Sequence, residues 1–286
     1  MIEIFLKSYK CFYVDEEINS SNGNTYEIGE RIGAGGNGAV YQGITQSGEP
    51  VAIKFLLRFD EKSKQRFSQE IKLMKKLHHP YIVEYIDDGE VELFKNKKRE
   101  VNEKALFVIM ELADTNLMDY LKQNKNVIRY DTYAPQFQGL SEALKNIHQF
   151  AIHRDIKPEN ILIKGGRWML SDFGLCEFLN PEEHRDITGQ KEKIGPIFWM
   201  SPEAVNHYYF EEDEIGTYSD VYQLGMIFAF ILTRKYPGGH HEVGDLINVP
   251  PQIENVIIKA ISNNYSFRQK NGGELFDEIQ NATIGR

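Results

Sequence analysis

The residues of this chain best suited to chemistry lie close together near its middle, in the motif HRDIKPEN and in the triplet DFG that follows it. Within these motifs, Asp155 can orient or deprotonate a hydroxyl group, and Lys157 can hold a positive charge beside it. Asn160 and Asp172 offer oxygen ligands of the kind that Mg²⁺ accepts together with phosphate oxygens. A hydroxyl acceptor, a cation and two metal ligands together predict a phosphoryl-transfer site.

The segment between the two motifs is expected to form a β-hairpin. Apolar residues 161–163 and 168–170 flank the dipeptide Gly165-Gly166, which is typical of a turn between two short strands. The hairpin would place Asn160 and Asp172 just outside its two ends, so the two metal ligands would lie near each other.

HRDxKPEN with a following DFG resembles the eukaryotic-type protein kinases, most closely their serine/threonine branch. The resemblance implies an α+β, bilobal protein kinase fold, with a small β-rich N-lobe that has one helix and a larger, mainly helical C-lobe. It places an N-terminal extension at residues 1–25, the N-lobe at 26–112 and the C-lobe at 113–286. ATP and Mg²⁺ are the implied cofactors, and the implied substrate is a protein.

A glycine-rich segment precedes these motifs and fits the pattern GxGxxGxV, with Gly33, Gly35, Gly38 and Val40 at the defined positions. Glycines lack a Cβ atom, so the backbone N–H groups around them can approach phosphate oxygens closely. Dinucleotide-binding folds use a similar pattern, but there a helix follows the glycines. Here a second strand is expected to follow, which favours the kinase version.

Residues 51–54 are expected to form a strand that carries Ala52 and Lys54 on one face. That face can place a small residue over adenine and an ammonium group on the α- and β-phosphates. Residues 61–77 have the apolar periodicity of a helix, and Glu70 lies on its apolar stripe. A carboxylate on such a stripe needs a partner, and Lys54 is the natural one; a solvated Glu70 is the alternative.

The resemblance also implies the rest of the nucleotide site. Met110 stands at the gatekeeper position, and the hinge that bonds adenine corresponds to residues 111–113. The residues expected to contact the nucleotide are Ile32, Gly33, Gly35, Gly38, Val40, Ala52, Lys54, Met110, Glu111, Ala113 and Leu162.

Three later residues match structural positions of the family. Glu203 lies in Ser201-Pro202-Glu203, where kinases have Ala-Pro-Glu, and Arg268 stands where the family's arginine pairs with that glutamate. Asp220 matches the buried aspartate that holds the backbone of the catalytic loop.

The sequence defines less clearly which amino acid of the substrate accepts the phosphate. Gly195-Pro196 occupies the place where serine/threonine kinases carry Gly-Thr, and this loop is more similar to that of tyrosine kinases. Lys157, in contrast, is typical of the serine/threonine branch. The expected function is transfer of the γ-phosphate of ATP to Ser/Thr hydroxyls of proteins, including autophosphorylation. A tyrosine or dual-specificity kinase, a pseudokinase-like interaction module and a small-molecule kinase of the aminoglycoside type stay open as alternatives.

Regulation is expected in the segment between Gly174 and Ser201, where Thr188 is the one residue with an aliphatic hydroxyl. In kinases with an arginine at the position of Arg154, a phosphate on this segment commonly neutralises it and orders the loop. Glu192 lies where many members of the family are phosphorylated. Its carboxylate is expected to pair with Arg154 and support a basal active state.

Two segments depart from a minimal kinase. The first, residues 1–25, predicts a strand or hairpin packed on the N-lobe, with a regulatory arm or a homodimer contact as the alternative. The second, residues 90–104, contains the basic run Lys95–Arg99 and predicts a solvated loop or hairpin, with a docking patch for an acidic partner as the alternative.

Composition sets outer limits on the function. The 286 residues include 42 Asp and Glu against 33 Lys and Arg, and the formal charge of −9 argues against a nucleic-acid partner. The two cysteines show no disulfide or metal-ligand spacing, which fits a reducing compartment. The apolar run 224–232 is too short to cross a membrane, and no signal peptide is evident. A cytoplasmic location without membrane attachment is therefore expected.

Overall fold

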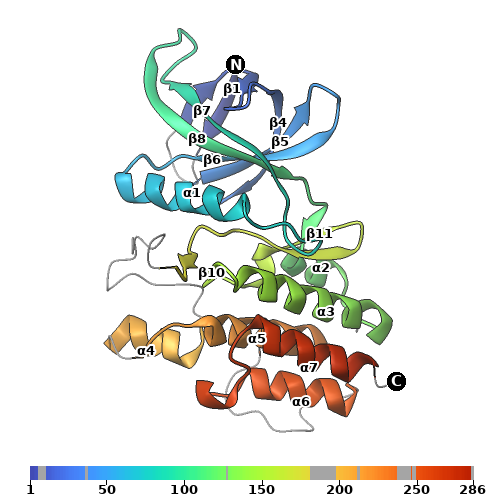
Figure 1. Ribbon diagram of the computed structural model, residues 1–286. Helices are drawn as coiled ribbons and strands as arrows, with labels where there is room; N and C mark the ends of the chain where they lie inside the picture. The colour runs from blue at the N-terminus through green and yellow to red at the C-terminus, as the bar shows by residue number, and fades with distance from the viewer. Residues whose placement is uncertain are drawn as a thin grey trace. The chain divides into compact units, whose positions relative to one another are not determined.

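The computed structural model describes residues 1–5, 11–35, 38–126, 128–180, 198–210, 213–236, 246 and 249–284. The chain forms two compact units, one of residues 1–76 and 83–113 and the other of residues 77–82 and 114–286 (Figure 1). The first unit is β-rich and the second is mainly helical, so the predicted α+β fold class is confirmed.

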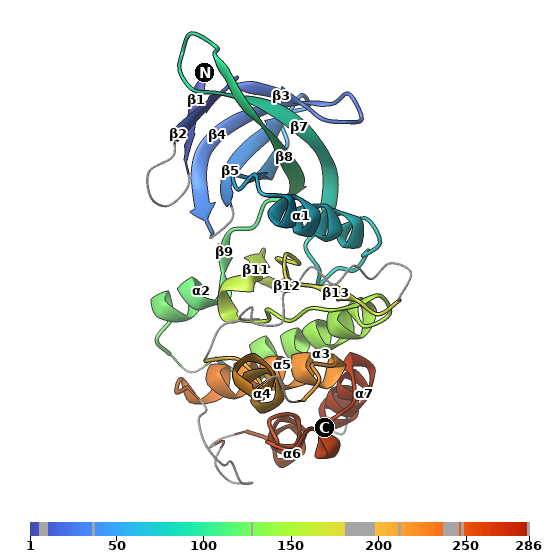
Figure 2. The same ribbon diagram turned by 90° about the vertical axis from the view of Figure 1, so that its left-hand side faces the viewer.

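The first unit is built on an eight-stranded antiparallel sheet with the strand order β1-β2-β7-β8-β6-β5-β4-β3. The sheet curls strongly (Figure 2). The strands are β1 (Ile2–Phe5), β2 (Cys11–Val14), β3 (Glu17–Asn19), β4 (Thr25–Ala34), β5 (Gly38–Thr45), β6 (Pro50–Leu56), β7 (Tyr85–Phe94) and β8 (Val101–Glu111).

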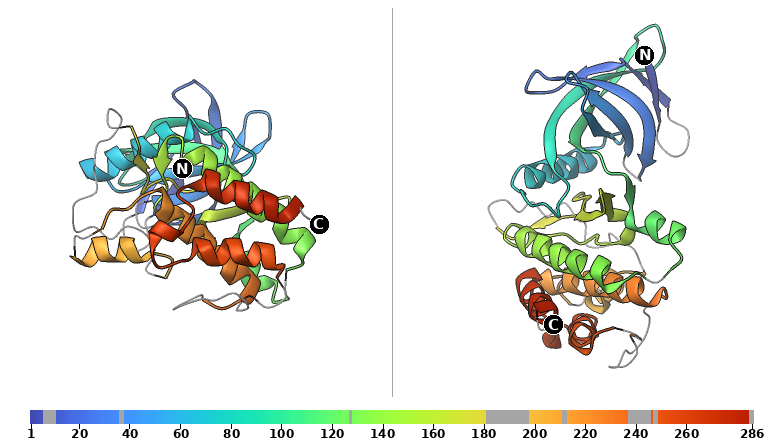
Figure 3. Two further views of the ribbon diagram at one scale, coloured as in Figure 1. Left: turned by 60° about the horizontal axis from the view of Figure 1, so that its bottom comes forward. Right: turned by 90° about the vertical axis from the view of Figure 1, so that its right-hand side faces the viewer.

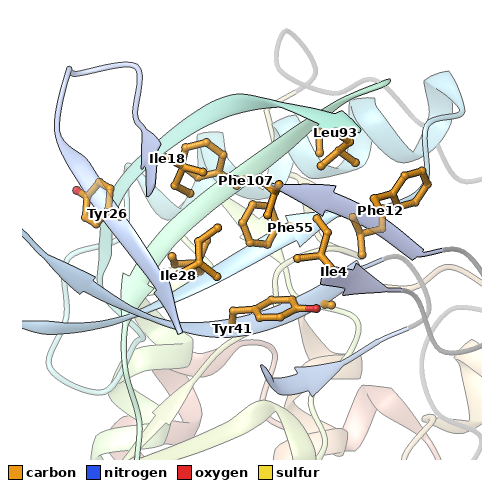
Figure 4. Close-up of a cluster of buried hydrophobic side chains, with 14 of the residues drawn as sticks. Ile4, Phe12, Ile18, Tyr26, Ile28, Tyr41, Phe55, Leu93 and Phe107 are labelled. Carbon is orange, nitrogen blue, oxygen red and sulfur yellow. The ribbon is translucent and has the colours of Figure 1, made fainter. Parts of the chain in front are cut away.

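Because the sheet curls, side chains from distant strands meet in one hydrophobic core (Figure 4). Ring contacts run through this core: Phe55 lies 5.9 Å from Tyr41 and 5.9 Å from Phe107, measured between ring centroids. Ile4 and Phe12 from the N-terminal strands are buried in the same cluster. The apolar residues of the N-terminal extension therefore belong to the core of the first unit.

The extension adds strands to both edges of the sheet, since β1 and β2 form a hairpin beside β7 while β3 pairs with β4. The hydroxyl of Tyr41 links β1 to β5: it accepts from the N–H of Phe5 at 3.3 Å and donates to the carbonyl of Glu3 at 3.4 Å. The guanidinium of Arg31 lies 4.3 Å from the centroid of the Phe5 ring. The strand or hairpin expected in this segment is therefore present and packed on the first unit.

Residues 90–104 form the far end of the β7–β8 hairpin, and only residues 95–100 lie outside its strands. Tyr13 of β2 pairs with Phe94 at this end. Arg99 makes two hydrogen bonds of 2.8 and 3.0 Å to the carboxylate of Asp15. Of the loop or hairpin predicted for residues 90–104, the hairpin is present. The extension contacts its far end through a backbone partner in β2 and through the negative charge of Asp15.

The helix of the first unit, α1 (Glu61–Met74), is capped at its N-terminus by Asp60, whose carboxylate accepts from the N–H of Ser63 at 3.0 Å. Its predicted apolar stripe is buried, with Glu70 among the buried residues. Strand β7 begins only at Tyr85, although residues 81–83 before it have the apolar character of a strand. The carbonyl of Tyr81 instead accepts from the N–H of Leu170 at 2.9 Å, which places this segment in the second unit.

The second unit contains the helices α2 (Leu117–Gln123), α3 (Tyr130–Ile147), α4 (Pro202–Phe210), α5 (Thr217–Thr233), α6 (Pro251–Ala260) and α7 (Gly272–Ile284). Two 3-10 turns span Pro158–Asn160 and Tyr265–Phe267. Residues 219–231 of α5 are all buried, as expected for a helix that is apolar on every side. Helix α7 packs against α3 and α6 (Figure 3). Among the described residues, none of the helices combines the length and hydrophobicity that crossing a membrane requires.

The short strands of the second unit frame the two chemical motifs. They are β9 (Thr115–Asn116), β10 (Ala151–Ile152), β11 (Ile161–Lys164), β12 (Arg167–Leu170) and β13 (Glu177–Phe178). Strands β11 and β12 pair from Ile161 opposite Leu170 to Lys164 opposite Arg167, so the hairpin predicted from the sequence is confirmed.

Candidate active site

The loop that contains the HRDIKPEN motif, called the catalytic loop below, is fixed by a buried carboxylate on α5. Asp220 accepts hydrogen bonds from the backbone N–H groups of His153 at 2.7 Å and Arg154 at 2.8 Å. Its Oδ2 atom also lies 2.9 Å from Nε2 of His148. Burial alone would raise the pKa of Asp220, but these contacts lower it overall and keep the carboxylate charged. The loop backbone is therefore held by charge-assisted hydrogen bonds, as the sequence motif predicts.

Asp155 receives two donors on the same oxygen. Nζ of Lys157 and Nδ2 of Asn160 each lie 2.8 Å from its Oδ2 atom. Burial raises the pKa of Asp155 above its ordinary value, and the charge and hydrogen bond of Lys157 oppose this rise. In the described part of the chain both donors converge on Oδ2, which leaves Oδ1 as the oxygen able to meet a substrate hydroxyl.

The amide of Asn160 has a defined orientation because Nδ2 also donates to the backbone carbonyl of Asp155, at 2.9 Å. Both neighbouring atoms are acceptors, so nitrogen must face them. The Oδ1 atom of Asn160 therefore faces away from Asp155 as an acceptor. An amide oxygen oriented in this way is a suitable ligand for a hard cation.

Asp172 is exposed, and its negative charge adds to the effect of burial in raising the pKa of Asp155. The next residue, Phe173, is buried, with its ring centroid 5.1 Å from that of His153. Asp172 and Arg154 both have left-handed backbone conformations, with φ values of 64° and 68°. Such conformations are uncommon outside glycine and persist where surrounding contacts impose them.

The two predicted metal ligands do not form a metal cage of protein atoms. Within the described residues, no group of three or more His, Cys, Asp or Glu side chains is placed to hold a metal ion. Magnesium is usually bound through one or two carboxylates while phosphates and waters complete its shell. The oxygen donors of Asn160 and Asp172 therefore fit a magnesium ion that arrives with a nucleotide.

In the first unit, Nζ of Lys54 lies 2.5 Å from Oε1 of Glu70. The Glu70 side chain is 4% exposed, so the alternative of a solvated glutamate does not hold. The Lys54 side chain remains 21% exposed, and its ammonium lies 5.9 Å from the centroid of the Phe67 ring. The pair thus fixes the ammonium of a lysine whose side chain remains partly exposed.

The glycine-rich turn joins β4 to β5, and the N–H of Gly35 donates to the carbonyl of Gly38 at 2.9 Å. A Cβ atom at Gly38 would lie 2.0 Å from the carbonyl oxygen of Phe55, so strand packing itself requires glycine there. A Cβ atom at Gly35 would meet nothing within 4 Å. Gly35 therefore borders open space, as a phosphate-binding turn needs.

The sheet register gathers the other predicted nucleotide residues of the first unit. Val40 lies opposite Lys54, and Ala52 lies opposite Met110. Ile32 is 51% exposed although it is apolar, which suits a side chain that covers a ligand. The remaining positions are Gly33 in β4, Glu111 at the end of β8, Ala113 at the end of the first unit, and Leu162 in β11 of the second unit.

Glu203 and Arg268 form the ion pair expected from the sequence. Their two hydrogen bonds measure 2.7 and 2.9 Å, and both side chains are buried. Ser219 donates to the same carboxylate at 2.7 Å. The buried bidentate pair anchors α4 to the residue that ends the 3-10 turn Tyr265–Phe267, and the bond from Ser219 ties α4 to α5.

Of the predicted regulatory residues, Thr188 and Glu192 lie outside the described residues. Arg154 is described, and its guanidinium is ion-paired with Glu177. No local pattern in the sequence indicates this partner. The pairing of β10 with β13 brings Glu177 close to Arg154, because it sets Glu177 opposite Ile152, two residues before Arg154. This pairing joins segments that are distant in the sequence.

Comparison with known proteins agrees with this arrangement. The family model described as "Protein kinase domain" matches residues 26–279. The chain belongs to the protein kinase family. The predicted bilobal kinase fold is confirmed by this match together with the curled sheet of the first unit and the helices of the second.

Several curated proteins are similar to this kinase. It is 33% identical to the serine/threonine-protein kinase pak-1 of Caenorhabditis elegans over 74% of the chain and 34% of that protein. It is 28% identical to the probable serine/threonine-protein kinase PknB of Lactococcus lactis, over 90% of the chain and 42% of that protein. The dual specificity protein kinase TTK of Mus musculus is 27% identical over 78% of the chain and 26% of that protein. The chain thus spans less than half the length of these relatives.

Proposed function

We propose that this kinase transfers the γ-phosphate of ATP to Ser and Thr hydroxyls of protein substrates and can phosphorylate itself. The observation that carries this proposal is the carboxylate of Asp155. Lys157 and Asn160 bind one of its oxygens at 2.8 Å, and the second oxygen is left for an incoming hydroxyl. This arrangement orients a hydroxyl acceptor beside a fixed positive charge, as phosphoryl transfer requires.

The proposed roles follow the chemistry of each group. The open turn at Gly35 and the ammonium of Lys54 bind phosphates, and Glu70 fixes that ammonium. Asn160 and Asp172 hold magnesium through oxygen atoms. The metal supplies positive charge that offsets the charge of the transferring phosphoryl group. Asp155 accepts the substrate proton, and Lys157 stabilises negative charge beside it.

Serine and threonine are the proposed acceptors because Lys157 contacts Asp155 directly, as the serine/threonine branch predicts. Two of the three relatives named above are serine/threonine kinases, and the third is a dual-specificity kinase. Tyrosine or dual specificity is the second candidate, and the Pro196 loop supports it. Residues 195–197 lie outside the described residues, so this candidate rests on sequence alone.

A pseudokinase and a small-molecule kinase receive less support. A pseudokinase usually lacks one of the catalytic groups, whereas Lys54, Glu70, Asp155, Asn160 and Asp172 are all present. A small-molecule kinase would not need the Glu203–Arg268 pair, which anchors α4, the helix that follows the segment between Gly174 and Ser201.

We also propose residues 26–112 and 113–286 as the two lobes, residues 1–25 as an accessory segment, and a cytoplasmic location.

A phosphotransfer assay tests these functions together. The purified protein is incubated with Mg²⁺, γ-labelled ATP and a mixture of protein substrates, beside Asp155→Ala, and the labelled amino acids are identified. Phosphoserine and phosphothreonine that depend on Asp155 support the proposal. Phosphotyrosine supports the second candidate, label only on an added metabolite supports a small-molecule kinase, and absence of label supports an interaction module.

A further inference from the structure

A turn in the N-terminal extension surrounds a buried carboxylate of β7. Asp87 is fully buried, and its oxygens accept from Nδ2 of Asn22 at 2.8 Å and from Nδ2 of Asn24 at 2.9 Å. The hydroxyl of Tyr26 donates at 3.1 Å, and the N–H of Asp88 donates at 2.9 Å. These donors are neutral, so the carboxylate is stabilised by the geometry of the turn.

The next two residues of β7 also accommodate this turn. The carbonyl of Asp88 accepts from the N–H of Ser21 at 2.8 Å. A Cβ atom at Gly89 would lie 2.7 Å from the Phe107 ring and 3.2 Å from Cα of Ser20. Gly89 therefore leaves the space in which the turn lies. Three consecutive residues of β7 contribute to seating the turn, which makes residues 20–24 a docked element.

The middle residue of this seat also contacts α1. The carboxylate of Asp88 is ion-paired with Nζ of Lys75 at 2.5 Å and is hydrogen-bonded to the hydroxyl of Tyr85. Lys75 is the C-cap of α1, and its backbone N–H donates to the carbonyl of Ile71. The ammonium of Lys75 also lies 5.3 Å from the centroid of the Tyr85 ring. The end of α1 is thus tied to the strand that seats the turn.

We propose that the turn at residues 20–24, with Asp87 and Asp88, positions α1 and thereby holds Glu70 on Lys54. The turn fixes Asp87, the backbone fixes Asp88 beside it, and Asp88 holds the C-terminal end of the helix that carries Glu70. Asp87, Asp88 and the two asparagines are therefore positioning residues. The effect on catalysis rests on the proposed function, because it requires that the Lys54–Glu70 pair serves ATP.

The test combines hydrogen exchange of the α1 amides with steady-state kinetics in ATP, using the full chain. The main variant is Asn22→Ala/Asn24→Ala, which removes two donors to Asp87 and no apolar core group. Amides of α1 are expected to exchange about tenfold faster than in the wild type, with a rise of about fivefold in KM for ATP. The control is Thr25→Val, which removes the exposed hydrogen bond from Thr25 to Asn19 in the same extension. It should leave both quantities within about twofold.

A second variant separates positioning from general stabilisation of the extension. Asp88→Asn removes the charge partner of Lys75 but keeps the carbonyl that binds Ser21. In this variant the amides of α1 should exchange faster than in the wild type, while the amides of β3 should exchange at the wild-type rate. Asp88→Asn is the decisive variant if the double alanine variant does not fold. The inference is overturned if Asp88→Asn leaves α1 exchange unchanged, or if the double variant loosens only the extension. Exchange is measured without turnover, so an inactive wild type would contradict the proposed function and leave this result interpretable.

Discussion

Asp155, Lys157 and Asn160 come from one short motif, and the sequence predicts that they act together. The sequence does not tell which oxygen of Asp155 receives the two donors, because that depends on how Asp220 holds the loop backbone from α5. Glu177 and Asp87 escaped prediction for the same reason. Their partners lie far away in the sequence, and no local pattern identifies a carboxylate that becomes paired or buried only through tertiary packing.

The Lys54–Glu70 pair gives a first prediction at the residue scale. Lys54→Met should lower kcat/KM for ATP by about 10²–10³-fold because a phosphate-aligned charge is lost. It should also lower the free energy of unfolding by about 3 kcal/mol, since Glu70 remains buried without its cation. Adding Glu70→Gln to this variant should recover part of the stability but none of the activity. Denaturant unfolding and steady-state kinetics on the three proteins check this; recovery of activity in the double variant would contradict the assigned roles.

Arg154 gives a second prediction. Its ion pair with Glu177 already places a negative charge beside the catalytic loop, so Glu177→Gln should reduce the initial rate more than Thr188→Ala or Glu192→Ala. We expect a loss of about tenfold for Glu177→Gln and less than about threefold for Thr188→Ala. Initial rates on one peptide give the comparison. If Thr188→Ala is inactive while Glu177→Gln keeps wild-type activity, phosphorylation of Thr188 switches the enzyme and this account of Arg154 is wrong.

At the scale of elements, the two segments that depart from a minimal kinase, the extension and residues 90–104, contact each other. In the sequence, the extension and residues 90–104 stand as separate features, because their pairing spans a long stretch of chain. In the structure β2 pairs with the far end of β7, and Arg99 binds Asp15. Local patterns predicted the strand at residues 51–54, the β11–β12 hairpin and α1 within a few residues, whereas these non-local pairings could not be read from periodicity.

The buried carboxylate of Asp87, which the turn at residues 20–24 surrounds, yields a prediction on pH. Burial alone would raise the pKa of Asp87, but hydrogen bonds from Ser20, Asn24 and the N–H of Asp88 lower it below its ordinary value of 3.8. A carboxyl group whose pKa is lower in the folded state than in the unfolded state stabilises the fold. This stabilisation is fully present above the pKa of the unfolded state and is lost as the pH falls through the pKa of the folded state. The difference in unfolding free energy between wild type and Asp87→Asn should therefore be largest near pH 6 and shrink below about pH 4. Urea unfolding across this range measures it, and a constant difference would contradict the argument.

At the scale of the whole molecule, the motifs alone predicted the family, the fold class and the division into a β-rich and a helical part. What they could not predict is the size of the first unit's core. Ile4, Phe12, Val14 and Ile18 enter it from a segment that the family match at residues 26–279 does not include. These side chains face strands contributed by later segments, so their burial follows from the curl of the whole sheet.

Removal of residues 1–24 should therefore unfold the first unit. Each of the four buried apolar side chains contributes about 1.5–3 kcal/mol by burial, and together they approach the total stability of an average domain. We expect the shortened chain to be insoluble or to melt at least about 10 °C lower than the full chain. Arg99→Ala is the control, because loss of its exposed pair with Asp15 should cost less than about 1 kcal/mol. A shortened chain that melts with the wild type would show the extension to be dispensable.

The central claim is that Asp155 accepts the substrate hydroxyl during phosphoryl transfer, and the most direct test compares the wild type with the isosteric variant Asp155→Asn. The measurement is kcat for transfer of the γ-phosphate of ATP to a Ser/Thr peptide, with thermal unfolding and ATP binding as controls. The account predicts a fall of about 10²–10⁴-fold in kcat, with unchanged melting and ATP affinity within about threefold. A folded Asp155→Asn variant that keeps kcat within tenfold of the wild type would contradict it.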